Sequence, residues 1–157
     1  MLAKNHFAIA LFAFLLVTPS LQWSFGSKTL LLVSMMFASL LPDLDTPNSL
    51  LSRKIFPLNY LGKFFLKHRG ILHSFLFWIA ISAIVWKFNY VISAGLLLGT
   101  FLHIVADSIT EEGTQAFWPF SWRVSGPIKT GSFVETVIFI IFLLGSGSLL
   151  GRILFNF

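Results

Sequence analysis

The chain contains no cysteine and few charged residues. The absence of cysteine from its 157 residues excludes disulfides and thiolate metal sites. Charged residues make up 11% and hydrophobic residues 56% of the chain, whereas a soluble domain carries roughly 25% charged residues. A small soluble domain must cover a large surface with polar groups, and a disordered chain has the opposite composition. A soluble domain and a disordered chain are therefore both excluded. We expect an all-α integral membrane bundle that forms a single domain over residues 1–157.

Acidic residues and histidines are scarce, with six Asp and Glu and four His. In so apolar a chain each of them is costly and needs a reason to be there. The eleven basic residues give a net charge of +5. They lie in loops beside apolar segments, where basic residues set topology and meet anionic lipid. We therefore expect a membrane lipid as the partner and no direct binding of nucleic acid.

Five apolar segments are apparent, at about residues 5–23, 28–41, 71–86, 90–106 and 133–155. A full crossing needs about 20 residues, and about 17 as a minimum. The second segment is short and Pro19 interrupts the first, so the alternatives are five crossings, or three crossings and a shallow hairpin. A signal peptide with Lys4 as its charged start is a further alternative, although no small-x-small cleavage pattern follows Val17.

Basic residues fix the orientation of these segments. The side that holds the N-terminus carries eight of them, and the opposite side carries three, Lys28, Lys87 and Arg152. The positive-inside rule then predicts a cytoplasmic N-terminus and an external C-terminus. In this topology every Asp, Glu and His lies at a cytoplasmic helix end or in one of two interfacial loops, about 42–70 and 108–132. The pattern predicts one site at one membrane face.

Two short motifs supply metal-ligand candidates. His103 and Asp107 are four residues apart, which puts them on one face of a helix; a structural hydrogen bond is the alternative to shared metal ligation. Asp43 and Asp45 are bracketed by prolines, which predicts an extended segment with both carboxylates on one side. Paired carboxylates repel unless a cation lies between them; the alternative is a turn at the membrane surface.

A third motif contains His68, Arg69 and His73. The two histidines are five residues apart and converge only if His68 precedes the start of a helix, a bend that Gly70 allows. Arg69 is suited to bidentate binding of phosphate, or else belongs to an interfacial basic cluster.

Residues after the fourth segment add a loop rich in aromatic and acidic side chains. Thr110, Glu111 and Trp118 lie in this loop, which either admits a lipid head group or anchors the chain at the interface. Glu135 begins the last segment, where it either caps the helix or completes the site.

The candidate ligands offer nitrogen and oxygen without thiolate. Such sets suit zinc above all, with manganese and iron as alternatives. Their number exceeds what one tetrahedral zinc needs, so we expect two or three ions that activate water. The candidate ligands are His6, Asp43, Asp45, His68, His73, His103 and Asp107.

At these residues the chain resembles the membrane-bound metal-dependent hydrolases, a family also called YdjM-like or LexA-binding inner-membrane hydrolases. The resemblance covers about residues 1–135 and implies a small protein of the prokaryotic inner membrane with a metal hydrolase site. The order of ligands is also similar to that of zinc phospholipase C, although this chain lacks a second His before Glu135. The resemblance to the membrane-bound metal-dependent hydrolases rests on His6, Asp43 and Asp45 after Pro42, His68 to Gly70, His73 with Ser74, His103 with Asp107, Thr110 with Gly113, and Pro119 with Phe120.

These features predict a hydrolase of a lipid-borne phosphoester at the cytoplasmic interface. Arg69 and Ser74 would grip the phosphate, Glu111 or Glu135 would be the base, and Thr110 and Trp118 would contact the substrate. The alternatives are a ceramidase-like lipid amidase, a metal or proton transporter, and a purely structural protein. Small residues at 145–148 also permit packing in a homo-oligomer.

Overall fold

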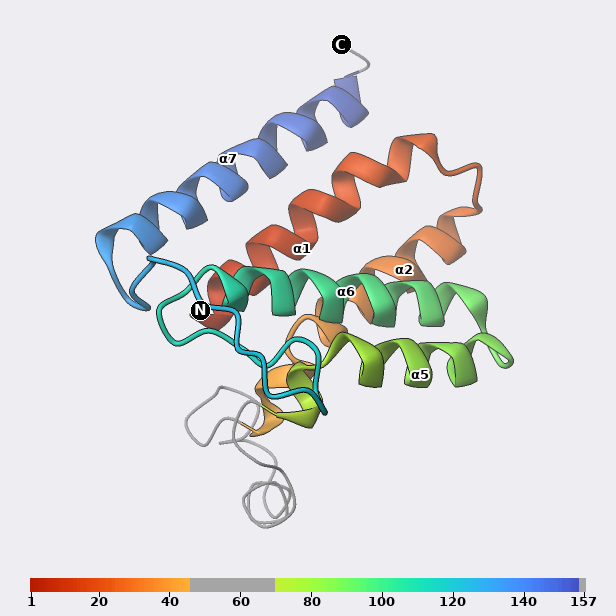
Figure 1. Ribbon diagram of the computed structural model, residues 1–157. Helices are drawn as coiled ribbons and strands as arrows, with labels where there is room; N and C mark the ends of the chain where they lie inside the picture. Colours follow the sequence, from red (N-terminus) through yellow and green to blue (C-terminus); the bar gives the residue numbers. More distant parts are fainter. Residues whose placement is uncertain (46–69, 156–157) are drawn as a thin grey trace.

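Five α-helices form the described part of the chain, residues 1–45 and 70–155, in the computed structural model (Figure 1). Three short 3₁₀ helices join them, η1 (Thr18–Ser20), η2 (Leu41–Asp45) and η3 (Ile71–His73). The all-α prediction is confirmed, and each predicted apolar segment corresponds to one helix. The five are α1 (Ala3–Val17), α2 (Phe25–Ala38), α5 (Phe75–Trp86), α6 (Tyr90–Ser108) and α7 (Phe133–Phe155).

Four of the helices are long and apolar enough to cross a membrane. They cover Ala3–Ser20, Phe25–Leu44, Tyr90–Ser108 and Phe133–Phe155. The first α-helix ends at Val17, just before Pro19, as the sequence predicts. Pro19 lies in the opening turn of η1, where its missing N–H is not needed, and η1 extends the apolar span to Ser20. The second reaches 20 residues because η2 extends it, so the prediction that this segment is the short one is wrong. The short helix is α5, whose 12 residues span only about 18 Å.

Side-chain caps set where two of the helices begin. The Ser24 hydroxyl accepts a hydrogen bond from the backbone N–H of Ser27 at the start of α2, at 3.2 Å. Asn89 Oδ1 accepts from the N–H groups of Val91 and Ile92 at the start of α6, at 2.9 and 3.0 Å. Such caps satisfy N–H groups that have no partner inside the helix. Asn89 thereby turns the chain back after α5, and α6 runs antiparallel to it.

Helix α6 is the centre of the packing, with α2, α5 and α1 against it, while α7 packs on α1. Two glycines on α6 allow α2 to come close. A Cβ atom on Gly99 would lie 2.4 Å from the backbone oxygen of Met35, and one on Gly95 would lie 1.9 Å from Oγ of Ser34. Small residues four apart are a common basis of helix contact in membranes. His103 and Asp107 continue the same four-residue spacing along α6. The candidate ligands therefore lie on the same face of the helix as Gly95 and Gly99.

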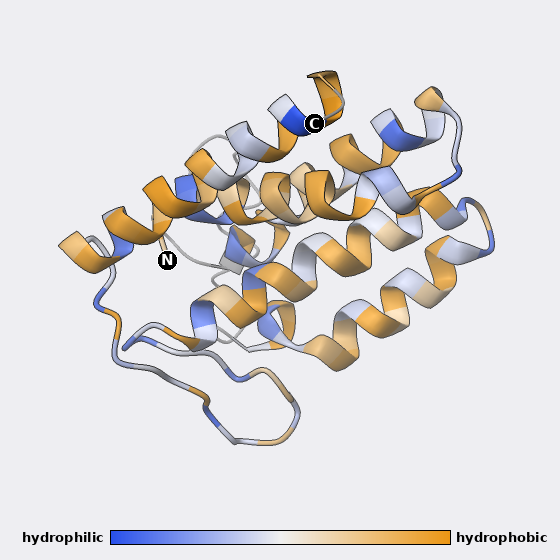
Figure 2. Ribbon diagram, turned by 90° about the horizontal axis from the view of Figure 1, so that it is seen from above, coloured by the Kyte–Doolittle hydropathy of each residue, from blue (hydrophilic) through white to orange (hydrophobic). Residues whose placement is uncertain are grey.

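The helices are mostly apolar along their length, as Figure 2 shows by hydropathy, and many of their large apolar side chains are exposed. Helix α7 is the extreme case, since only Glu135 and Ser146 of its 23 residues are buried. A helix exposed in this way suits contact with lipid rather than with water.

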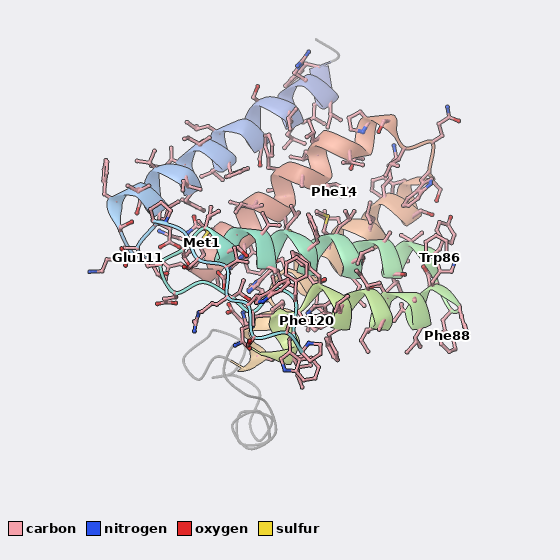
Figure 3. All side chains as sticks on the ribbon, viewed as in Figure 1. Met1, Phe14, Trp86, Phe88, Glu111 and Phe120 are labelled. Carbon is pink, nitrogen blue, oxygen red and sulfur yellow. The ribbon has the colours of Figure 1, made fainter. Side chains whose placement is uncertain are left out.

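The polar residues gather where five helix ends meet, at the start of α1, α5 and α7 and the end of α2 and α6 (Figure 1). The segment between α6 and α7 runs across this end. In Figure 3, Met1 and Glu111 lie at this end, and Trp86 and Phe88 lie at the other end of the α5–α6 pair. The predicted gathering of acids and histidines at one end of the bundle is thus observed for the described residues.

Candidate metal centre

Two side chains near the end of α6 form the middle of a buried cluster. His103 and Asp107 are both inaccessible to solvent. Nε2 of His103 lies 3.6 Å from Oδ2 of Asp107. The four-residue spacing therefore brings imidazole and carboxylate together, as the sequence predicts, inside the bundle.

Two further candidates come from the short 3₁₀ helices. His73 is the last residue of η3, and its Nε2 lies 3.6 Å from Oδ2 of Asp107. Asp43 belongs to η2, and its Oδ1 lies 3.8 Å from Nε2 of His103. One ligand atom from each of these four residues lies within 4.8 Å of the other three. We call Asp43, His73, His103 and Asp107 the metal group.

The metal group passes a test of fit for a cation. Within the described residues, His103 Nε2 and Asp107 Oδ2 are buried and have no hydrogen-bond partner. A buried polar atom left in this state costs about 1–3 kcal/mol, and a cation between the two would remove the cost. Bond lengths of about 2.0–2.2 Å in tetrahedral zinc sites place ligand atoms about 3.3–3.6 Å apart, close to the 3.6 and 3.8 Å found here. The group can hold a metal ion, and its nitrogen and oxygen donors suit zinc, manganese and iron.

The end of α2 orients the imidazole of His103. Nδ1 of His103 lies 2.7 Å from the backbone oxygen of Ser39. A carbonyl oxygen only accepts hydrogen bonds, so Nδ1 carries the proton and Nε2 directs a lone pair at the metal group. Metal-binding histidines commonly donate their other N–H in this way, which fixes the ring.

His6 joins the cluster from α1 without belonging to the metal group. Its Nε2 lies 3.3 Å from Oδ1 of Asp107. Its ring stacks on that of His103, with 3.9 Å between centroids and 14° between planes. The amino group of Met1 contacts the same Oδ1. The sequence predicts His6 as a metal ligand. In the structure His6 lies against Oδ1 of Asp107, whereas His73 and His103 face Oδ2 of the same carboxylate.

Glu135 is buried at the start of α7, where it joins this helix to α1. Its Oε1 accepts from the backbone N–H of Leu2 at 2.6 Å and from Nδ2 of Asn5 at 2.7 Å. Its Oε2 accepts from the backbone N–H of Gly131. Both oxygens are therefore engaged, which supports a role in helix packing over the role of a base.

The segment between α6 and α7 covers the metal end of the bundle. The Ser74 hydroxyl donates to the backbone oxygen of Trp118 at 2.9 Å, and Phe75 N–H donates to the oxygen of Ala116 at 2.9 Å. Thr110 is buried, and its hydroxyl donates to the backbone oxygen of Asp107 at 2.8 Å. Ser74 and Thr110 thus hold this segment close to His73 and Asp107.

Glu111 and Trp118 lie further out on that segment. Glu111 is exposed and Trp118 is half-buried. The backbone N–H of Glu111 donates to the oxygen of Ile128 at 2.9 Å, which holds the two arms of the segment together at this point. The exposed carboxylate of Glu111 remains at the same end of the bundle as the metal group (Figure 3).

Some predicted site residues are not described. His68 and Arg69 lie outside the described residues, as does the side chain of Asp45. The prediction that residues 42–46 are extended is wrong over Leu41–Asp45, which is the 3₁₀ helix η2. Asp43 N–H donates to the oxygen of Leu40 at 3.2 Å, and proline is tolerated in an opening helical turn, where no N–H is needed.

Sequence reasoning missed three contributors to this centre, which are Ser39, Asn5 and the glycine pair of α6. Ser39 acts through its backbone, which no residue type reveals. Asn5 could have been noticed, because a buried amide beside His6 is unusual in an apolar segment. Gly95 and Gly99 have the small-x-x-x-small spacing that marks close helix contact.

The chain is similar in sequence to known membrane and uncharacterized proteins. The inner membrane proteins YdjM of Escherichia coli (strain K12) and of Shigella flexneri are each 33% identical over 105 residues, which cover 60% of this chain and 52% of theirs. The uncharacterized protein YvsG of Bacillus subtilis (strain 168) is 33% identical over 104 residues, 64% of this chain and 65% of its own. The matches with YdjM thus span about half the length of that protein. No solved structure matches significantly.

The family model described as YdjM inner membrane protein matches residues 1–155, nearly the whole chain. Four helices that are long and apolar enough to cross a membrane lie in the described part of that range. The chain therefore belongs to the YdjM inner membrane protein family, as its motifs indicate.

Proposed function

We propose that this protein is a hydrolase of a lipid-borne phosphoester that depends on a divalent metal ion. The metal group, buried at one end of an apolar bundle, is the observation that carries the proposal. A divalent cation held there supplies Lewis acidity and activates water for attack. We propose zinc, whose catalytic sites take three nitrogen or oxygen ligands from the protein and leave a fourth position for water, so that three of the four donors suffice. Asp45 and His68, as further ligands, would provide for a second or third ion.

The residues around the metal group have separate roles in this proposal. Ser39 holds His103 in the required tautomer. Ser74 and Thr110 hold the covering segment in place, so that Trp118 contacts the substrate. Glu111 is the base, because its carboxylate is exposed at this end whereas both oxygens of Glu135 are engaged. Arg69 clamps the phosphate with its planar guanidinium.

An apolar groove in the half of the bundle that carries the metal group supports a lipid substrate. The groove has a volume of about 350 Å³ and lies between α5 and α6. Phe75 follows His73 by two residues and Phe101 precedes His103 by two, so the groove reaches the metal end of the bundle. An acyl chain in the groove places its head group near the metal group, which a soluble phosphoester would not require. The lining residues are Phe75, Trp78, Ile79, Leu97, Leu98, Thr100 and Phe101.

The placement of polar groups disfavours a transporter. Ionisable residues of a transport path occupy the membrane midplane or both halves. Among residues 1–45 and 70–155, the acids and histidines instead belong to segments at the metal end of the bundle. A path across the membrane therefore has no acidic residue or histidine along its second half in the described part.

The test combines metal content with turnover. Wild type, Asp107→Asn and His103→Gln are purified in detergent, and each is assayed by elemental analysis and with phosphoester lipids and N-acyl sphingolipids. We expect wild type to contain zinc and to release phosphate or a phosphorylated head group, and both variants to lose metal and turnover. Glu112→Gln is the matched control, because it neutralises an exposed carboxylate at the same end.

Two results would decide against the proposal. Folded Asp107→Asn and His103→Gln proteins that keep full metal content would remove the metal group as the site. Release of fatty acid from N-acyl lipids without cleavage of any phosphoester would replace the phosphoesterase with a lipid amidase at the same metal group.

A further inference from the structure

A second cavity lies at the end of the bundle opposite the metal group. Its volume is about 560 Å³, and the end of α1, the start of α2 and the end of α7 contribute to its walls. Figure 1 shows these three helix ends at the same end of the bundle. The walls are mostly apolar, but they include one lysine and one arginine. The lining residues are Leu15, Leu16, Thr18, Pro19, Lys28, Leu149, Arg152 and Ile153.

The two cations have no acidic neighbour at this end. The six acids of the chain all belong to η2, to the end of α6, to the segment after it or to the start of α7, which lie at the metal end. Among the described residues, Lys28 of α2 and Arg152 of α7 therefore share a cavity without an acidic side chain to balance them. Both side chains are common ligands of phosphate, Arg by paired hydrogen bonds and Lys as a point charge.

The apolar walls identify the kind of anion. Leu15 is buried, whereas Leu16 is 59% exposed and Ile153 is 40% exposed, so the cavity opens on the lipid-facing surface of the bundle. A free phosphate ion would gain nothing from these leucine and isoleucine side chains. An acyl chain gains free energy for each CH₂ group that it buries against them.

We propose that this cavity binds an anionic phospholipid of the surrounding membrane. The phosphate lies against Lys28 and Arg152, and an acyl chain lies along Leu15, Leu149 and Ile153. The lipid bridges the start of α2 and the end of α7. It supports α7, whose only buried residues are Glu135 and Ser146. This site is separate from the metal group in place, in charge and in function.

The experiment measures lipid binding to delipidated protein in a neutral detergent. Phosphatidylglycerol and phosphatidylcholine with the same acyl chains are titrated, and native mass spectrometry and thermal unfolding report the binding. We expect one phosphatidylglycerol molecule to bind and to raise the unfolding temperature, with binding at least about tenfold tighter than that of phosphatidylcholine.

Variants connect that preference to the cavity. Lys28→Gln with Arg152→Gln should remove the preference for phosphatidylglycerol. Arg152→Gln alone, at an exposed position that folding tolerates, should reduce it. Lys87→Gln is the matched control, since Lys87 follows α5 at the same end of the bundle but does not line the cavity, and it should bind as wild type does.

Three outcomes would overturn the proposal. Equal binding of the two lipids would remove the role of charge. An unchanged preference in folded Arg152→Gln would place the lipid elsewhere. Stabilisation by inorganic phosphate alone, equal to that by phosphatidylglycerol, would make the ligand a free anion. None of these measurements depends on metal content or on turnover, so their outcome is independent of the proposed hydrolase function.

Discussion

His103 and Ser39 are linked across two helices, because Nδ1 of His103 donates to the backbone oxygen of Ser39 at 2.7 Å. The link determines which ring nitrogen faces Asp43 and Asp107 and so gives the metal group its directed lone pair. It exists only because α2 and α6 approach closely. The orientation of the His103 ring in the metal group therefore depends on residues outside that group, which allow α2 and α6 to come close.

The first prediction concerns the glycine that permits this approach. In Gly99→Ala, the new Cβ would lie 2.4 Å from the backbone oxygen of Met35 and 2.8 Å from Cβ of Ala38. The helices must separate, at a cost of about 1–3 kcal/mol for overpacking, and Ser39 must move from His103. We expect a lower unfolding temperature together with reduced zinc affinity.

Gly147→Ala provides the comparison for this variant. Gly147 also lies in a helix, α7, but nothing is within 4 Å of a Cβ built on it. We expect its metal affinity and unfolding temperature to match or exceed those of wild type. Unchanged zinc affinity in Gly99→Ala would show that the His103–Ser39 contact does not need this packing.

A second prediction follows from two buried atoms of the metal group, Nε2 of His103 and Oδ2 of Asp107, which have no hydrogen-bond partner among the described residues. Removal of metal by a chelator should destabilise the protein, since a ligand at 100 times its dissociation constant contributes about 2.7 kcal/mol to stability. Differential scanning fluorimetry with and without chelator measures this, and added zinc should restore the loss. The unfolding temperature of Asp107→Asn should not respond to either treatment. If a chelator left the unfolding temperature of wild type unchanged, the metal group would not hold a stabilising ion, and the prediction would be wrong.

The sequence predicted the helices and their meeting point well, because these depend on local patterns. The bounds expected for the last helix, 133–155, are those of α7, since a long apolar run has no internal signal to end it. The gathering of the ligands followed from the positive-inside rule and from the spacing of His103 and Asp107. Such features need no knowledge of tertiary contacts.

The remaining features depend on packing between distant parts of the chain. The approach of Asp43 to His103 requires both the 3₁₀ turn of η2 and the close contact at Gly99, whereas two flanking prolines indicated an extended segment. Two of the partners of Glu135, Leu2 and Asn5, lie 133 and 130 residues away in sequence. Spacing alone could not separate a packing carboxylate from a catalytic one.

The third prediction separates these two roles of Glu135. Glu135→Ala removes the acceptor of the N–H groups of Leu2 and Gly131 and of the Asn5 amide, and a buried donor left unpaired costs about 1–3 kcal/mol. We expect a clearly lower unfolding temperature. Metal content per folded molecule should stay as in wild type, because Glu135 lies outside the metal group.

Asn5→Ala tests the same contact from the other side. It should lower the unfolding temperature by less, because it removes one of the three donors to Glu135 and leaves the carboxylate in place. If Glu135→Ala abolished turnover at a temperature where it is fully folded and metal-loaded, while Asn5→Ala retained turnover, Glu135 would be the base after all.

The last prediction concerns the groove between α5 and α6. Leu97 lines it and is 38% exposed, so Leu97→Trp should fill part of the 350 Å³ with little disturbance of the core. We expect turnover of long-chain lipid substrates to fall about tenfold or more, because the acyl chain loses apolar contact, while short-chain analogues are cleaved as before. Leu144→Trp, at a 69% exposed position on α7, is the control for a tryptophan added to the lipid-facing surface. An equal loss for long and short chains in Leu97→Trp would mean that the substitution disturbs the metal group through α6, and the groove would then no longer support a lipid substrate.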